Sequence, residues 1–510
     1  MKCKANQVRL WMSLILLIML TVGINPVAGQ VVNPENFPTT PAGKNEINSL
    51  WYVGEIDTPG YADDVKVVGD YAYIADGEYG LRIIDVSNPT APEELGAFDT
   101  PGTVLAVDVV GSYAYLVEHQ WLYVVDVSDP ESPSQVSVSA TSSLNYDIAV
   151  SGYNAYIGTG YPAGLSVWNI SNPAYPYQVG FCPTEWWGYG LALSGSYAYL
   201  ATSYYGLNVI DISNSVNPVE VGNYDMPGGI AEHVDVEGDY AYLAAGFWMH
   251  LRIIDVSDPA DPEEVAYYET PGDPLDVVVE WGFAYVADNT GVSVLDIGDP
   301  ESPFLVGSYP SSGTANGLGV DNGYIYVANG AAGLLILRSS FSISGWVTDA
   351  GGNPIEEVTI TATGDHTTVT DETGAYGFSD LEAGTYTLTA SKDGYNFAPT
   401  SLEVTLPPNA TDQDFVGTPI TSTISGLVID PDGMPIPDVT MSFTGGYSTT
   451  TDLSGEYSLG SLPAGSYTII PTKAGYNFTP DYRNVTLPPD AIDQDFIGET
   501  FRQFLPVMVK

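Results

Sequence analysis

Short apolar runs alternate with turns rich in glycine, proline, asparagine and serine along most of the chain. The first clear unit predicts four strands, at residues 64–68, 71–75, 81–86 and 94–99. The third run is apolar at nearly every position, which is typical of strands in a sheet that is covered on both faces. The pattern therefore predicts an all-β protein built from small, closely packed sheets.

One unit of this pattern recurs seven times. Five copies carry an aromatic–alanine–aromatic triplet, while the third copy has Tyr153-Asn154-Ala155-Tyr156 and the seventh has Tyr324-Ile325-Tyr326 in its place. The second aromatic residue is Tyr73, Tyr115, Tyr156, Tyr199, Tyr242, Tyr285 or Tyr326. The resulting spacing of 41–43 residues is the length of a four-stranded propeller blade. We therefore expect a seven-bladed β-propeller over residues 47–339.

The seventh copy has only three predicted strands. Residues 53–60 match residues 95–102, which form the fourth strand and following turn of the first copy. An N-terminal strand in the last blade would close the ring and remove the exposed sheet edges of an open array. We expect this closure.

Most third strands end in aspartate, as in the run 81–85, and a turn of the type Val86-Ser87-Asn88-Pro89 follows. Aspartate and serine side chains bond local backbone in such turns, while proline ends the strand. We interpret the recurrent aspartate as a structural turn residue.

The third-strand motifs resemble the LVIVD-repeat family of bacterial and archaeal surface proteins, although residues 165–169 and 334–338 lack the aspartate. The resemblance implies a propeller fold and a surface role, and it supplies no catalytic residues.

After residue 340 the composition shifts to threonine, glycine and proline, and two copies of another pattern follow at an offset of 81 residues. Gly394-Tyr395-Asn396-Phe397 matches Gly475-Tyr476-Asn477-Phe478. Alternating strands with frequent turns predict two tandem β-sandwich domains, at residues 341–418 and 422–499. They resemble the carboxypeptidase regulatory-like domain, a transthyretin-like sandwich grouped with carbohydrate-binding-like folds. That domain accompanies a catalytic one, so the resemblance does not imply peptidase activity.

Acidic turns in these sandwiches, such as those at Asp371 and Asp430, could serve either local turn chemistry or calcium. Their spacing does not fit a twelve-residue calcium loop, which favours turn chemistry.

The chain has 63 acidic residues against 13 Lys and Arg, a formal net charge of −50. This charge argues against nucleic acid and anionic membranes as partners.

Residues 1–29 have the basic, apolar and small-residue regions of a secretory signal, and residues 30–46 are interpreted as a linker. Without that leader, Cys182 is the remaining cysteine, and we expect it to be packed in the fold. We expect a secreted or surface-attached monomer without a membrane span.

The tail at residues 500–510 is too short to span a bilayer. It is interpreted either as an extra edge strand or as an export-linked segment.

Counting back from each triplet places a polar or small residue at the start of every first strand, next to the propeller axis. These residues are Asp64, Ala106, Asp147, Gly190, His233, Asp276 and Gly317. Loops on the same face carry aromatic residues: Tyr79, Trp121, Tyr161, Trp186, Trp187, Tyr204, Tyr205, Phe247 and Trp248. Carboxylates with an aromatic rim suit a polyhydroxylated or cationic ligand. In the alternative interpretation the acids only hydrate the channel and the aromatic side chains pack the loops.

Asp64, Asp147, His233 and Asp276 have side chains that can bind a metal, but their placement on four different blades argues that they lie too far apart for one ion. The other histidines, His119, His250 and His366, form no metal-spaced pair, so no metal is expected. The chain shows no phosphate loop and no nucleophile elbow, so nucleotide use and triad hydrolysis lack support and no cofactor is expected. The leading hypothesis is a non-enzymatic protein that binds an extracellular glycan or a surface protein. The rival hypotheses are a polysaccharide hydrolase or lyase that uses the axial carboxylates, and a purely structural scaffold.

Overall fold

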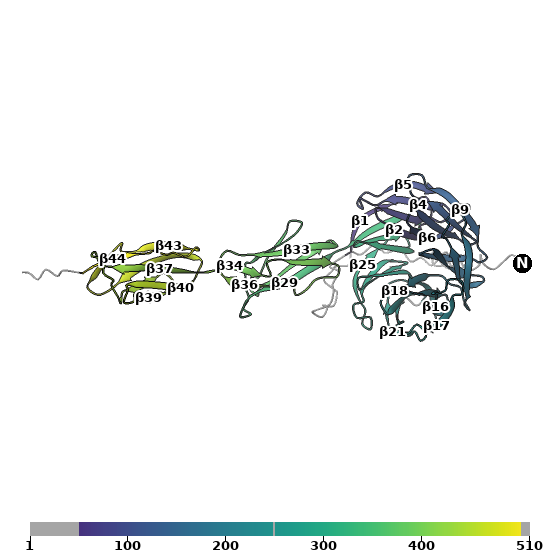
Figure 1. Ribbon diagram of the computed structural model, residues 1–510. Helices are drawn as coiled ribbons and strands as arrows, with labels where there is room; N and C mark the ends of the chain where they lie inside the picture. The colour runs from purple at the N-terminus through teal and green to yellow at the C-terminus, as the bar shows by residue number, and fades with distance from the viewer. Residues whose placement is uncertain (1–49, 248–249, 501–510) are drawn as a thin grey trace, which may run out of the picture. The chain divides into compact units, whose positions relative to one another are not determined.

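The computed structural model describes residues 50–247 and 250–500, and all regular elements in these ranges are β-strands. The strands form eleven four-stranded sheets within the described residues. Seven sheets are arranged around an axis as the blades of a β-propeller, and four form two β-sandwiches (Figure 1). Across this part of the chain, no helix has the length and apolar character that a membrane crossing requires. The predicted fold class is confirmed.

The first three blades are meanders of consecutive antiparallel strands. Their strands are β2 (Asp64–Val68), β3 (Tyr71–Ala75), β4 (Leu81–Asp85) and β5 (Glu93–Phe98); β6 (Val104–Val110), β7 (Tyr113–Glu118), β8 (Trp121–Asp126) and β9 (Ser134–Ala140); β10 (Asn145–Ser151), β11 (Asn154–Gly160), β12 (Ala163–Asn169) and β13 (Tyr177–Pro183). In blades 1–5 a glycine at φ 58–63°, such as Gly69, opens the turn between the first and second strands. Glycine adopts this left-handed conformation without the steric cost of a side chain.

Blades 4–6 repeat the meander. Their strands are β14 (Leu191–Ser194), β15 (Tyr197–Thr202), β16 (Gly206–Asp211) and β17 (Val219–Asp225); β18 (Ile230–Glu237), β19 (Tyr240–Gly246), β20 (His250–Asp255) and β21 (Glu263–Glu269); β22 (Pro274–Glu280), β23 (Phe283–Asp288), β24 (Gly291–Asp296) and β25 (Phe304–Pro310). The second and third strands are the most buried, as with Leu243 and Ile253, because blades cover both of their faces.

The seventh blade combines the two ends of the propeller sequence. Its strands β26 (Gly317–Asp321), β27 (Tyr324–Ala328) and β28 (Leu334–Ser339) are followed in space by β1 (Leu50–Ile56), which pairs antiparallel with β28. β1 therefore supplies the fourth strand of this sheet.

Strand 4 of several blades carries a glycine because the neighbouring blade's proline turn approaches its backbone closely. A Cβ built at Gly54 would lie 2.3 Å from the carbonyl oxygen of Pro89, and one at Gly96 would lie 2.3 Å from that of Pro130.

Each C-terminal domain consists of two four-stranded sheets. The first domain contains β29 (Phe341–Asp349), β30 (Thr359–Ala362), β31 (His366–Val369), β32 (Ala375–Leu381), β33 (Gly384–Ser391), β34 (Tyr395–Ala398), β35 (Leu402–Leu406) and β36 (Phe415–Pro419). Its sheet orders are β32-β29-β36-β34 and β31-β30-β33-β35. Val347, Ile360, Leu388 and Phe415 are fully buried in it.

The second sandwich repeats this topology. It contains β37 (Thr421–Ile429), β38 (Thr440–Phe443), β39 (Ser448–Thr450), β40 (Glu456–Pro463), β41 (Gly465–Thr472), β42 (Tyr476–Thr479), β43 (Arg483–Leu487) and β44 (Phe496–Thr500). Its sheet orders are β40-β37-β44-β42 and β39-β38-β41-β43. β36 and β44 each run one residue beyond the domain ends expected from the sequence.

The recurrent aspartate after the third strand has the predicted structural role. Asp85 accepts a hydrogen bond from the backbone N–H of Ser87 at 2.8 Å, and Asp126, Asp211 and Asp255 do the same two residues ahead. Hydrogen bonds from the following serine lower the pKa of all four carboxyl groups.

The acidic turns of the sandwiches use the same chemistry. Asp371 accepts from the backbone of Thr373 and Ala375, and Asp430 accepts from the backbone of Asp432 and Met434. Each of these carboxylates therefore stabilises the turn in which it lies.

Cys182 is buried and unpaired, as expected, and burial raises the pKa of its thiol. The predicted signal at residues 1–29 and the linker at 30–46 lie outside the described residues, as does the tail beyond Thr500.

Candidate functional site

The axial ring brings three of its four candidate polar residues into direct contact. Nδ1 of His233, in β18, lies 2.6 Å from Oδ1 of Asp276 in β22, and its Nε2 lies 3.5 Å from Oδ2 of Asp147 in β10. The imidazole therefore joins blades 3, 5 and 6. These three residues meet although they lie on different blades.

Gly190, the ring residue of blade 4, explains how His233 reaches across to blade 3. A Cβ built at Gly190 would lie 2.4 Å from Cα of His233 and 2.6 Å from its Cδ2. No real side chain fits at that distance, so the imidazole occupies space that an alanine in blade 4 would block.

The axial carboxylates also connect the backbone of neighbouring blades. Asp64 accepts from the N–H of Val65 at 2.7 Å and from that of Val107, in blade 2, at 2.9 Å. Asp276 accepts in the same way from Val277 and from Leu318 in blade 7. Each carboxylate thus links its own strand to the first strand of the next blade.

Sequence reasoning missed a second ring, two residues further along the first strands. Asp108 bridges Val109 to Val150 of the next blade, and Asp235 bridges Val236 to Val279. Lys66 pairs with Asp108 at 3.0 Å. Since side chains of a strand alternate between its two sides, reading every second residue from Asp64 would have found this ring.

Burial and mutual charge shift the proton affinities of the ring. Burial alone would lower the pKa of His233, but the carboxylates of Asp276 and Asp147 raise it well above its ordinary value. Burial and the charges of Asp147 and Asp276 raise the pKa of Asp64 to about 7. The ring is therefore an ionic network centred on a protonated imidazole.

Residues 50–247 and 250–500 contain no group of three or more His, Cys, Asp and Glu arranged to hold a metal ion. In the axial ring the cationic imidazole already lies between the two carboxylates.

The aromatic rim is concentrated at blade 4. Trp186, in the loop from β13 to β14, meets two tyrosines of the loop from β15 to β16: its ring centroid lies 5.5 Å from that of Tyr204, edge to face, and 6.1 Å from that of Tyr205, nearly parallel. The exposed fractions of the three residues are 40%, 55% and 36%. We call Trp186, Tyr204 and Tyr205 the aromatic cluster.

Trp187 has a different role from its neighbour. Its half-buried ring stacks on Tyr146 at 6.2 Å, and Tyr189 packs edge-on against Tyr146 at 4.8 Å. The loop backbone is tied to both flanking blades, because Gly188 N–H donates to Thr159 and Tyr189 N–H donates to Ala201. The inner rings therefore anchor the loop that presents Trp186.

This loop departs from the pattern at four other blade junctions. There, a glycine N–H donates to a side chain at the end of the second strand of the next blade or one residue beyond it, in the pairs Gly60–Asp76, Gly102–Glu118, Gly272–Asp288 and Gly313–Asn329. Between blades 3 and 4 the residues at 184–190 include two tryptophans and a tyrosine instead.

The other predicted rim residues are dispersed. Trp121 begins β8 in blade 2 and is exposed, and Tyr79, Tyr161 and Phe247 are exposed in loops of blades 1, 3 and 5. Trp248 lies outside the described residues.

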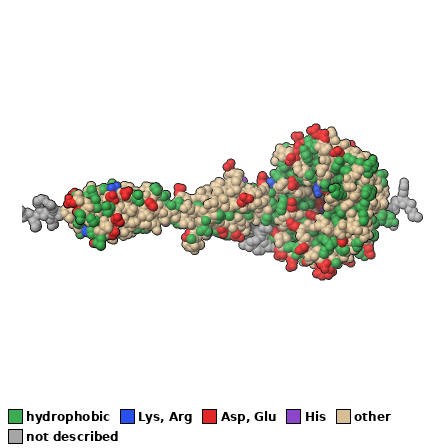
Figure 2. All heavy atoms as spheres, in the orientation of Figure 1, with side chains coloured by type: hydrophobic (Ala, Val, Ile, Leu, Met, Phe, Trp, Pro, Cys, Tyr) green, Lys and Arg blue, Asp and Glu red, His purple; other side chains and the backbone are tan. Residues whose placement is uncertain are grey.

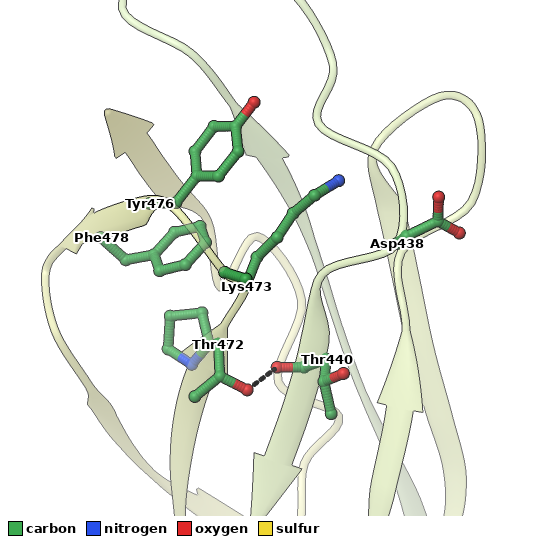
Figure 3. Close-up of a pocket in the computed structure, with 8 residues that line it drawn as sticks. Asp438, Thr440, Thr472, Lys473, Tyr476 and Phe478 are labelled. Carbon is green, nitrogen blue, oxygen red and sulfur yellow. Dashed lines mark hydrogen bonds between the residues drawn. The ribbon is translucent and has the colours of Figure 1, made fainter. Parts of the chain in front are cut away.

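Each sandwich has an open groove at the matching Gly-Tyr-Asn-Phe motif. In the second sandwich it has a volume of about 470 Å³ and is lined by Asp438, Thr440, Lys473, Tyr476 and Phe478 (Figure 3). The Lys473 ammonium lies over the Tyr476 ring and donates to the carbonyl of Pro437, and Tyr476 stacks on Phe478. Lys392 and Tyr395 repeat the arrangement in the first sandwich. The sequence shows this motif as a repeat, but nothing in its spacing predicts the groove.

A segment of this chain is similar to the chitinase ChiA of Flavobacterium johnsoniae, with 37% identity over 118 residues. That segment is 22% of this chain and 7% of the chitinase, so the chain spans only a small part of that protein's length.

Among solved structures, the chain is similar to the WD40 repeats of RRP9 (11% identity, TM-score 0.48, 58% of this chain and 99% of that chain). It is also similar to the Neurospora crassa Pan2 WD40 domain, with 12% identity, a TM-score of 0.48, and coverage of 58% of this chain and 96% of that chain. A functionally unknown protein from Desulfotomaculum acetoxidans gives 14% identity, a TM-score of 0.46, and coverage of 51% and 89%.

Two family models match the chain. The carboxypeptidase regulatory-like domain matches residues 342–416 and 423–496. The LVIVD repeat matches residues 59–100, 101–141, 145–184, 189–226, 228–270, 271–311 and 312–338. Because these seven matches together cover more than half of the sequence, the chain belongs to the LVIVD-repeat family, with two carboxypeptidase regulatory-like domains after its propeller.

Proposed function

We propose that this chain is a non-enzymatic extracellular binding protein and that the aromatic cluster of blade 4 contacts a carbohydrate. The observation that carries the proposal is the exposure of three rings on loops outside the blade cores, with Trp186 in contact with both Tyr204 and Tyr205. Such rings offer flat apolar faces with polar edges, which suit the apolar face of a sugar ring. Adjacent exposed aromatic residues are also the kind of surface that marks an interaction site.

The packing beneath the aromatic cluster favours binding. Trp187, Tyr146 and Tyr189 hold the loop through ring contacts, and backbone hydrogen bonds tie it to β11 and β15. A site that is ordered before binding loses less conformational entropy when the ligand arrives.

An extracellular location is supported by the predicted signal at residues 1–29 and by the surface role that the family resemblance implies. Because the relative that is 37% identical over 118 residues is named a chitinase, chitin is among the first carbohydrates to test.

The rival function, a polysaccharide hydrolase or lyase, draws support from Asp64. A carboxyl group with a pKa of about 7 has the proton affinity of a general acid at neutral pH. Against it, both oxygens of Asp64 accept backbone hydrogen bonds, and Asp147 and Asp276 are paired with His233. These contacts favour a structural role for the axial acids.

The binding proposal is tested by co-sedimentation of the full chain with insoluble chitin, deacetylated chitin, cellulose and xylan. We expect Trp186→Ala to lower affinity for the bound polymer by about tenfold, the usual loss on truncating an important aromatic contact. Trp346→Ala is the matched control, because Trp346 is also exposed (46%) but lies in the first sandwich. Equal effects of the two substitutions, or sedimentation with none of the polymers, would refute the proposal.

The rival function is tested on the same polymers by the release of reducing ends or unsaturated products. We expect no turnover by the full chain. Turnover that Asp147→Asn and Asp276→Asn abolish would establish the enzyme instead.

A further inference from the structure

The aromatic cluster lies in a part of the chain without lysine or arginine. Between Arg82 and Arg252 the sequence contains neither lysine nor arginine, and this stretch includes all of blades 2, 3 and 4. On the face shown in Figure 2, carboxylates are spread widely and basic groups are rare. Blades 2, 3 and 4 therefore carry a net negative charge, which favours the approach of cations over that of anions.

Carboxylates also lie at the cluster itself. Glu185 directly precedes Trp186 and is exposed. Hydrogen bonding to Glu185 and the charges of Glu185 and Asp225 raise the pKa of the Tyr205 hydroxyl. Burial and the charge of Glu185 raise the pKa of Glu220. A ligand that stacks on these rings would thus meet negative charge at their edge.

The faces of the rings add a second attraction for cations. The π-systems of tryptophan and tyrosine carry negative charge on their faces, so they bind ammonium groups, most strongly when water is excluded. Trp186 and Tyr205 are nearly parallel, with an interplanar angle of 23°, while Tyr204 is turned by 74° from Trp186. Ring faces in two orientations, with Glu185 beside them, suit a group that is both apolar and positively charged.

We propose that the saccharide bound at Trp186, Tyr204 and Tyr205 carries free amino groups, as in a polymer of glucosamine. The sugar ring stacks on the aromatic faces, and its ammonium group is balanced by Glu185. This inference rests on the proposed carbohydrate-binding function and names the class of sugar.

The test compares one polymer in two chemical states: deacetylated chitin, and the same sample after N-acetylation, which removes the positive charge. The full chain is assayed at a mildly acidic pH that keeps the amines protonated. We expect acetylation to weaken binding at least tenfold, and Glu185→Gln to weaken binding of the deacetylated form severalfold. Glu131→Gln, at an exposed turn residue of blade 2, is the control for loss of one negative charge.

The outcomes separate this inference from the function on which it rests. Equal binding of both polymer states, lost in Trp186→Ala, would overturn the amino-sugar inference and leave carbohydrate binding intact. Binding of the deacetylated form that Trp186→Ala and Trp346→Ala leave unchanged would reflect general attraction to an acidic protein and would overturn the inference. Stronger competition by polylysine than by glucosamine oligomers, at equal amine concentration, would assign the cluster to basic peptides and would also overturn it.

Discussion

At the scale of single residues, the contacts along the propeller axis depend on charged side chains and on a glycine that leaves space for one of them. Gly190 leaves the space through which His233 reaches Asp147, while Asp276 holds the other ring nitrogen. Asp64, Asp108 and Asp235 connect backbone groups of adjacent blades. These three carboxylates therefore stabilise the contacts between blades, because both oxygens of each accept backbone N–H groups.

This network makes the stability of the propeller depend on pH. The pKa of His233 is raised in the folded state, so its contribution is complete below about 6.5 and is lost as pH rises through the higher folded value. The pKa of Asp64 is raised to about 7, so folding is favoured on the acid side and this contribution is lost as pH rises through 7. The turn carboxyls such as Asp85, with lowered pKa, lose their contribution only as pH falls below about 4.

We therefore expect the propeller of the full chain to unfold at a higher temperature at pH 5 than at pH 8 by scanning calorimetry. Asp64→Asn should reduce this difference by a few degrees, because roughly 1 kcal/mol shifts the unfolding temperature of a large domain by about 2–4 °C. In the unsubstituted protein Asp64 accepts two backbone N–H groups, one on each oxygen. Asparagine has only one acceptor oxygen, so the variant should also be less stable at pH 5. Higher stability at pH 8 than at pH 5 would contradict this account of the axis.

At the scale of elements, closure of the ring depends on β1. Its pairing with β28 covers an edge that would otherwise present unpaired backbone groups. Gly54 also brings β1 close to the turn of blade 1 at Pro89.

Gly54→Ala tests that closure. Its Cβ would lie 2.3 Å from the Pro89 oxygen, so we expect a destabilisation of roughly 1–3 kcal/mol, the usual range for overpacking. Gly307→Ala is the matched control in strand 4 of blade 6, since its Cβ would meet nothing nearer than 3.4 Å. Denaturant unfolding that shows equal effects of the two variants would mean that β1 does not occupy this position in solution.

The elements were more predictable from sequence than the contacts between them. The repeated triplets ending at Tyr73 and its equivalents predict blade number and the axial positions, because strand geometry ties both to a period of about 42 residues. The contact of His233 with Asp147 was not predictable in this way, since it spans two blades and requires a missing side chain at Gly190. Likewise, only the packing of Tyr146 and Tyr189 shows that Trp187 supports the loop while Trp186 is presented to solvent.

At the scale of the whole molecule, charge and aromatic surface together limit the kind of ligand. A net charge of −50 disfavours polyanions, and the absence of Lys and Arg between residues 82 and 252 makes the surroundings of the aromatic cluster acidic. The sandwiches offer a second kind of surface, with Lys392 and Lys473 over tyrosine rings. Mapping where a sugar binds therefore shows whether the aromatic cluster of the propeller or the lysine–tyrosine surface of the sandwiches is the binding site.

Hydrogen–deuterium exchange of the full chain, with and without a glucosamine oligosaccharide, tests the central claim most directly. We predict slower exchange at residues 184–190 and 203–206 on addition of the sugar, because the ligand would shield and order these loops. Protection confined to the sandwich strands β34 and β42, or to the axial strands of the propeller, would contradict the assignment of the binding site to the aromatic cluster.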